Sequence, residues 1–149
     1  MLRYRETGNL HKDFHAGTSL ALDFLYEKHG EKAIAEVLHN TGTKVYASIH
    51  YKLKNDDPSE LIEHFAYFYN REEADFDLHV TENEITLTVR QCPAIAHIRK
   101  LGLTPSKHFC QTTLLINQAL CEDSPWASET SIVGDGQCVQ RFFRKEAHK

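Results

Sequence analysis

The stretch DFDLHVTENEITLTVR, residues 75–90, decides the fold of this chain. Apolar and polar side chains alternate along its two arms, and Glu82-Asn83 separates the arms. The apolar positions are Phe76, Leu78, Val80, Ile85, Leu87 and Val89. A period of two residues places alternate side chains on one face of a strand, and a short polar break between two such runs is typical of a tight turn. The stretch therefore predicts an antiparallel hairpin with one buried face and one wetter face.

A second hairpin is predicted near the C-terminus, over residues 129–144. Ser131-Ile132-Val133 forms its first arm, and residues 138–143 form its second. The turn Gly134-Asp135-Gly136-Gln137 joins them, because glycine tolerates the positive φ that tight turns require.

Two helices are predicted between the hairpins. Pro93 opens a short helix that Gly102 closes, since proline suits the first turn of a helix and glycine its end. Thr104-Pro105-Ser106 starts a longer helix that runs through Cys121.

The N-terminal half carries helical periodicity instead. A helix is predicted from Leu10, capped by Asn9, to His29, and a third helix follows Pro58 and ends near Asn70. The second helix, residues 31–54, contains Thr41-Gly42-Thr43, which favours a kink or a break there. Residues 1–9 are polar and are predicted to be loosely ordered.

The predicted order is ααα-ββ-αα-ββ, within a single domain that spans residues 1–149. Helices segregated from hairpins favour an α+β fold, in which helices cover an antiparallel sheet of about four strands. A length of 149 residues suits one domain.

Composition narrows the classes of partner. The formal net charge of -4 gives no general attraction to nucleic acid or to an anionic membrane. No apolar run approaches the roughly 20 residues of a membrane span, and the first residues lack the apolar core of a secretory signal. We therefore expect a cytoplasmic protein with a small-molecule ligand, without nucleic-acid or membrane partners, and a homodimer as the candidate assembly. In a reducing compartment its four cysteines are expected to be thiols or ligands.

Three of these cysteines lie at the edges of predicted elements, where they can converge on one pocket. Cys92 lies between a strand and a helix N-terminus, a position that lowers the pKa of a thiol and favours the nucleophilic, metal-binding thiolate. Cys110 lies about one turn into its helix, and Cys138 follows the glycine turn. Each can instead be a small residue of the core, and Cys121, on a helical stripe, is expected to be one. No pair has C-x-x-C spacing, so a shared metal site depends on the fold.

Among the ten histidines, His15 and His97 are the candidates for acid–base chemistry. His11 and His15 are four residues apart and share one helical face, but Lys12 stands where a metalloprotease motif has glutamate. His97 follows Cys92 by five residues, so it points partly away from it. Five acidic residues between positions 60 and 75 are interpreted as solvated charges of a helix and a turn: Glu60, Glu63, Glu72, Glu73 and Asp75.

Residues 84–142 resemble the L-2-amino-thiazoline-4-carboxylic acid hydrolase family. The similarity is carried by a strand ending in Cys92-Pro93-Ala94, the helix of residues 95–102, Cys110, Asn117-Gln118-Ala119-Leu120 and Gly134-Asp135-Gly136-Gln137-Cys138. Residues 10–15 and 22–25 are similar more loosely. The family resembles in layout the vinyl-reductase-like small-molecule-binding domains. The resemblance implies an α+β fold, a pocket over the sheet, and opening of a thiazoline ring.

Three readings of function follow. The first is a hydrolase-like protein that opens a small sulfur- and nitrogen-containing heterocycle, such as L-2-amino-thiazoline-4-carboxylate. Cys92 acts as nucleophile or ligand, Cys110 and Cys138 as its partners, and His15 or His97 as acid or base. Zinc, held by the three cysteines, is the candidate ion of an alternative mechanism. The second reading is a non-catalytic sensor that binds a small molecule or a metal, and the third is a structural dimer module with core cysteines.

Overall fold

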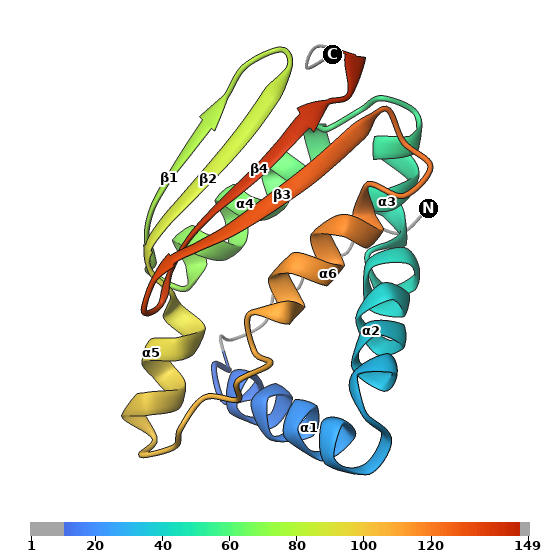
Figure 1. The fold of residues 1–149 in the computed structure, drawn as a ribbon. Coiled ribbons are helices and arrows are strands. Elements are labelled where there is room, and N and C mark those ends of the chain that lie inside the picture. Colours follow the sequence, from blue (N-terminus) through green and yellow to red (C-terminus); the bar gives the residue numbers. More distant parts are fainter. Residues whose placement is uncertain (1–10, 147–149) are drawn as a thin grey trace.

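A computed structural model describes residues 11–146 as six α-helices, one π-helical segment and four strands (Figure 1). The helical elements are α1 (Phe14–His29), α2 (Glu31–Asn40), the π-helical η1 (Thr41–Val45), α3 (Ala47–Lys54), α4 (Ser59–Arg71), α5 (Pro93–Lys100) and α6 (Gln111–Leu120). The strands are β1 (Asp75–Val80), β2 (Glu84–Gln91), β3 (Trp126–Gly134) and β4 (Gln137–Arg144). The two predicted hairpins are therefore both present.

The hairpins join into one antiparallel sheet with the strand order β1-β2-β4-β3. The central pair is β2 and β4, in which Val89 lies opposite Cys138 and Leu87 lies opposite Gln140. This confirms the predicted α+β class and the predicted four-stranded sheet.

The sheet has one helix-covered face and one open face. Ile85, Leu87 and Val89 of β2 are buried, and so are their neighbours Gln140 and Phe142 on β4. On the open face, arginines pair with acidic side chains across strands. Arg90 contacts Asp75 and Asp77, and Arg141 contacts Glu84 and Glu129.

The buried residues form two apolar clusters. The sheet cluster combines the inner face of the sheet with side chains from α3, α4 and α6, such as Leu53, Phe65 and Leu120. The end cluster joins α1, α2 and α5 through residues such as Leu22 and Ile34, and Figure 1 shows α1 and α5 beyond the end of the sheet. Cys92 and Ile116 are partly buried and pack against both clusters.

The helix predicted over residues 31–54 is interrupted at the predicted place. Residues 41–45 form η1, so the chain divides there into α2 and α3. Gly42 is buried, and a Cβ atom added to it would lie 2.6 Å from the Cβ of Ala119 on α6. The glycine therefore allows η1 and α6 to approach closely.

Two predicted helix boundaries are wrong. The first helix begins at Phe14 rather than Leu10, and its predicted cap, Asn9, lies outside the described residues, as do the polar residues 1–9. The helix predicted to follow Thr104-Pro105-Ser106 begins only at Gln111.

The late start of α6 has a physical reason. Ser106 bonds to α1, because its N–H donates to Ser19 Oγ at 2.8 Å and its hydroxyl donates to Asp23 Oδ1 at 2.5 Å. These contacts hold the segment against α1 in a non-helical path. No helix within residues 11–146 has the length and apolarity needed to cross a membrane.

Candidate functional site

A central cavity of about 560 Å³ lies where the two apolar clusters meet. Most of the side chains that line it are apolar, and they come from α1, α2, η1, α4, α6 and the segment around Cys92. Phe14, Val37 and Val45 line the cavity and are each 44–54% exposed, so they mark its mouth. The cavity therefore has an opening to solvent at the surface formed by α1, α2 and η1.

Polar groups also line this cavity. We call the four lining residues His15, Cys92, Asn117 and Gln140 the polar pole. Gln140 projects from the inner face of β4, and Asn117 projects from α6 toward it, so strand alternation and helical spacing bring two buried amides together. A mostly apolar space with a few converging polar groups is the usual form of a small-molecule site.

Cys92 caps the N-terminus of α5, as the sequence predicted. Pro93 occupies the first turn, and the Cys92 N–H donates to the carbonyl of Gly136 at 2.7 Å. Gly136 has a φ of 65°, a conformation that glycine adopts at little cost, and it brings the β3–β4 turn against the start of α5.

The expected lowering of the Cys92 pKa is wrong. Burial raises the pKa of this thiol, and the donated N–H groups of Ile95 and Ala94 lower it by less. The negative charge of Glu72 also raises the pKa of Cys92. Cys92 is therefore a neutral thiol at neutral pH, and an isolated nucleophilic thiolate is not preformed at the helix terminus.

The other cysteines occupy three different environments. Cys138 lies on the inner sheet face and accepts a hydrogen bond from Gln140 Nε2 at 3.6 Å. Cys110 is exposed just before α6 rather than one turn into it. Cys121 belongs to the sheet cluster, as predicted, and burial raises its pKa to about 12.

The three predicted site cysteines lie in one neighbourhood, although they do not share the cavity. Burial raises the pKa of Cys138, and thiolates at Cys92 and Cys110 would raise it further. A thiolate at Cys110 would likewise add to the rise that burial gives the pKa of Cys92. Of the described residues that line the central cavity, Cys92 is the one cysteine. Within residues 11–146, no three His, Cys, Asp or Glu side chains are arranged to hold a metal ion. The expected zinc site of Cys92, Cys110 and Cys138 therefore finds no support.

His15 is buried and bonded to a carboxylate. Its Nε2 lies 2.5 Å from Glu72 Oε1, and both side chains are only about one-tenth exposed. Glu72 follows the last turn of α4, where Lys12 Nζ donates to its backbone carbonyl at 3.0 Å. The interpretation of Glu72 as solvated charge was therefore wrong, and so was that of Glu60, which is buried and accepts a hydrogen bond from Ser48 at 2.6 Å.

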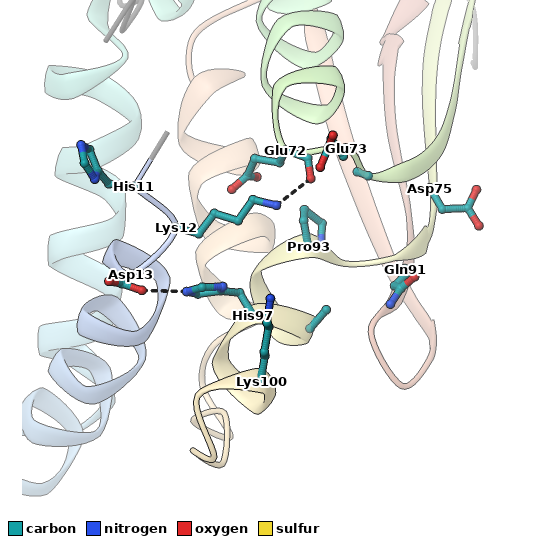
Figure 2. A pocket seen from close by; sticks show the side chains of 12 residues that line it. His11, Lys12, Asp13, Glu72, Glu73, Asp75, Gln91, Pro93, His97 and Lys100 are labelled. Atoms are coloured by element: carbon teal, nitrogen blue, oxygen red, sulfur yellow. Dashed lines mark hydrogen bonds and ion pairs between the residues drawn. The ribbon is translucent and has the colours of Figure 1, made fainter. Parts of the chain in front are cut away.

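A second, open cleft of about 540 Å³ is lined by Glu72 and by residues of α5 and of the segment before α1 (Figure 2). Glu72 lines this outer cleft, and His15 lines the central cavity, so the pair stands in the wall between the two spaces. Figure 2 shows Lys12 reaching toward Glu72 and His97 pointing at Asp13.

His97 belongs to the outer cleft rather than to the cysteines. Its Nε2 lies 2.8 Å from Asp13 Oδ1, and it does not line the central cavity. No histidine among residues 11–146 hydrogen-bonds to Cys92. The structure therefore brings His15, but not His97, to the space that Cys92 lines.

The two amides of the polar pole and Tyr69 behind them form a chain of hydrogen bonds, and sequence reasoning missed all three as site residues. Asn117 Nδ2 donates to Gln140 Oε1 at 2.9 Å, and Gln140 Nε2 donates to Tyr69 Oη at 3.2 Å. Burial raises the pKa of Tyr69, so its hydroxyl stays neutral. A polar residue at an inward strand position, between Cys138 and Phe142, was the signal that could have identified Gln140.

His64 also lines the cavity, from α4. Burial lowers its pKa from 6.5 to about 4, and its ring lies 5.3 Å from the Tyr46 ring and 4.7 Å from the Phe68 ring, measured between centroids. The cavity thus holds two histidines, one bonded to a carboxylate and one held neutral among aromatic rings. This arrangement can bind a small molecule and can exchange hydrogen bonds with it at the polar pole. No family model, no curated protein and no solved structure matches this chain.

Proposed function

We propose that this protein binds a small, largely apolar molecule in its central cavity. The observation that carries the proposal is the cavity itself, with about 560 Å³ of space, apolar walls and a polar pole. Binding sites for small molecules usually measure about 300–1,000 Å³ and combine apolar walls with a few placed polar groups.

The apolar lining of the cavity favours binding over a purely structural role. The outer cleft has nearly the same volume, but most of the residues that line it are polar or charged. An apolar molecule that covers the walls of the central cavity removes them from water, which stabilises the complex. Cys92 lines this space rather than filling a solid core, which disfavours the reading of a structural module.

A neutral fluorescent probe, N-phenyl-1-naphthylamine, tests the proposal. We expect a saturable rise in its fluorescence on binding. Leu25→Trp should weaken binding about tenfold or more, because Leu25 lines the cavity and indole would occupy the ligand's space.

Leu20→Trp is the matched control on the same helix. Leu20 is 60% exposed and does not line the cavity, so this variant should bind like the wild type. Circular dichroism and thermal melts establish that both variants fold. Binding that never saturates, or that Leu25→Trp leaves unchanged in a folded protein, would refute the proposal.

Hydrolytic opening of a small sulfur- and nitrogen-containing heterocycle is the second candidate. Two observations favour it. Cys92 lines the same cavity as His15, and it is one of the residues that carry the resemblance to the thiazoline hydrolases. Attack by the sulfur first requires the thiol proton to move to a base, and the raised pKa of Cys92 makes that transfer harder. Simple binding is therefore the better-supported function.

Mass spectrometry separates these two candidates. A ring-opening hydrolase should convert L-2-amino-thiazoline-4-carboxylate into a product heavier by one water, and Cys92→Ser should abolish this. If the substrate stays intact while the fluorescent probe binds, the protein binds without hydrolysing this compound. A cytoplasmic location, a homodimer, and a lack of nucleic-acid and membrane partners stay predictions.

A further inference from the structure

The donors of the buried amides at the polar pole are already engaged. Gln140 Nε2 donates to Tyr69 and Cys138, and Gln140 Oε1 accepts from Asn117. Asn117 Nδ2 also donates to Thr130, at 3.4 Å. Within residues 11–146, no group donates a hydrogen bond to Asn117 Oδ1. The amide pair therefore offers a ligand an acceptor rather than a donor.

His15 offers a second acceptor. Its Nε2 lies 2.5 Å from the Glu72 carboxylate, which can only accept, so Nε2 is the donor of this hydrogen bond. In the neutral ring with its proton on Nε2, Nδ1 has a lone pair and accepts. No hydrogen bond joins Nδ1 to a described residue, and His15 lines the cavity. A ligand at the polar pole thus meets a histidine acceptor whose tautomer Glu72 fixes.

The cavity offers no compensation for a negative charge. Among its described lining residues there is neither lysine nor arginine, and Lys12 points to the Glu72 carbonyl on the side of the outer cleft (Figure 2). Glu72 stands at the wall beside His15, and its negative charge adds to the rise that burial gives the pKa of Cys92. Burying an anion here would cost desolvation without an ion pair in return.

We infer that the central cavity selects a ligand that carries no negative charge and that donates an N–H or O–H hydrogen bond to His15 Nδ1, with Asn117 Oδ1 as the alternative acceptor. This inference rests on the proposed binding function and names the class of ligand. It also bears on the hydrolase candidate. The amino group of L-2-amino-thiazoline-4-carboxylate suits this pole, whereas its carboxylate does not.

Competition against N-phenyl-1-naphthylamine tests the inference with three compounds that share a fused bicyclic shape. Indole has an N–H donor, 1-benzofuran replaces this group by an oxygen acceptor, and indole-3-carboxylate adds a negative charge. We expect indole to displace the probe about five- to tenfold more effectively than benzofuran, which is what one hydrogen bond contributes. Indole-3-carboxylate should be the weakest of the three.

Two variants assign the effect to the His15–Glu72 pair. The double variant His15→Leu/Glu72→Leu removes both groups and leaves no buried charge unpaired, so it should bind the probe yet no longer distinguish indole from benzofuran. Glu72→Gln keeps an oxygen acceptor for Nε2 but removes the charge, so it should improve binding of indole-3-carboxylate with little effect on indole. The control is His39→Leu/Glu122→Leu, a His–Glu pair at 2.6 Å that lies half-exposed and does not line the cavity.

Each outcome has a defined meaning. If the wild type binds the probe but indole and benzofuran compete equally, or indole does not compete at all, the inference is overturned and the proposed function stands. If indole-3-carboxylate binds more tightly than indole, the exclusion of anions is wrong. If the probe itself shows no saturable binding, the proposed function fails, and the inference fails with it.

Discussion

Replacing Gly42 by alanine tests the close approach of η1 to α6. Gly42 lies in η1, and a Cβ atom there would be 2.6 Å from Ala119 Cβ and 3.1 Å from the Ile116 carbonyl oxygen. Both neighbours belong to α6, and neither is the end of a flexible side chain. The substitution must therefore push η1 and α6 apart.

The expected loss of stability can be worked from opposing terms. Overpacking a well-packed site costs about 1–3 kcal/mol, while alanine is favoured over glycine in a helix by up to about 1 kcal/mol. These opposing terms lower the free energy of unfolding of Gly42→Ala by roughly 0–2.5 kcal/mol. Gly17→Ala is the control, because a Cβ at this position of α1 meets nothing within 4 Å. That variant should gain about 0.5–1 kcal/mol.

Urea unfolding of the two single variants measures both values. A third variant, Gly42→Ala/Ala119→Gly, removes the nearer clash and should recover part of the loss, since contacting residues couple in a double-mutant cycle. If Gly42→Ala proves as stable as Gly17→Ala, the close approach of η1 and α6 does not exist in solution. Because Ile116 and Asn117 of α6 line the cavity, the same variant should also weaken probe binding.

Three further outcomes follow from burial and exposure. Burial lowers the pKa of His64 to about 4 in the folded protein, so the unfolded chain binds a proton first as the pH falls. Stability should fall between about pH 6.5 and pH 4, by at most roughly 3 kcal/mol, and urea titrations of His64→Phe should show a flatter pH profile over this range. Cys110 is exposed, so a thiol reagent should show one fast-reacting group that disappears in Cys110→Ser, while Cys92 reacts more slowly; an unchanged fast phase would contradict the assignment. Leu22→Ala and Phe65→Ala should each cost about 2–5 kcal/mol in thermal or urea unfolding, and losses below about 0.5 kcal/mol at both would show that these side chains are not in the core.

The sheet could be predicted because its side chains alternate clearly. In β2, Ile85, Leu87 and Val89 face inward between threonines, and this pattern has no helical counterpart. The first part of β3 was missed for the opposite reason. Ser128 lies opposite the inward-facing Phe142, so a polar residue stands where the pattern requires an apolar one.

The candidate site was only partly predictable. The position of Cys92 before Pro93 identified the start of α5, because a strand, a cysteine and a proline define that boundary locally. Its raised pKa could not be read from the same residues, since it depends on burial between two clusters. The partnership of His15 with Glu72 joins residues 57 positions apart, and only the tertiary fold distinguishes Glu72 from the adjacent, exposed Glu73.

The division of the core into two apolar clusters affects how the protein unfolds. The cavity separates part of their facing surfaces, with Leu22 and Leu38 on the side of the end cluster and Phe65 and Leu120 on the side of the sheet cluster. Contacts missing across that boundary weaken the cooperativity between the clusters, so α1 and α5, which pack together, form a unit that can unfold below the global free energy, whereas α2 also packs on α6. Amide protons of this unit should then exchange with solvent sooner than those of β2 and β4. A molecule that fills the boundary would touch both units, and it would convert two partly independent melting units into one.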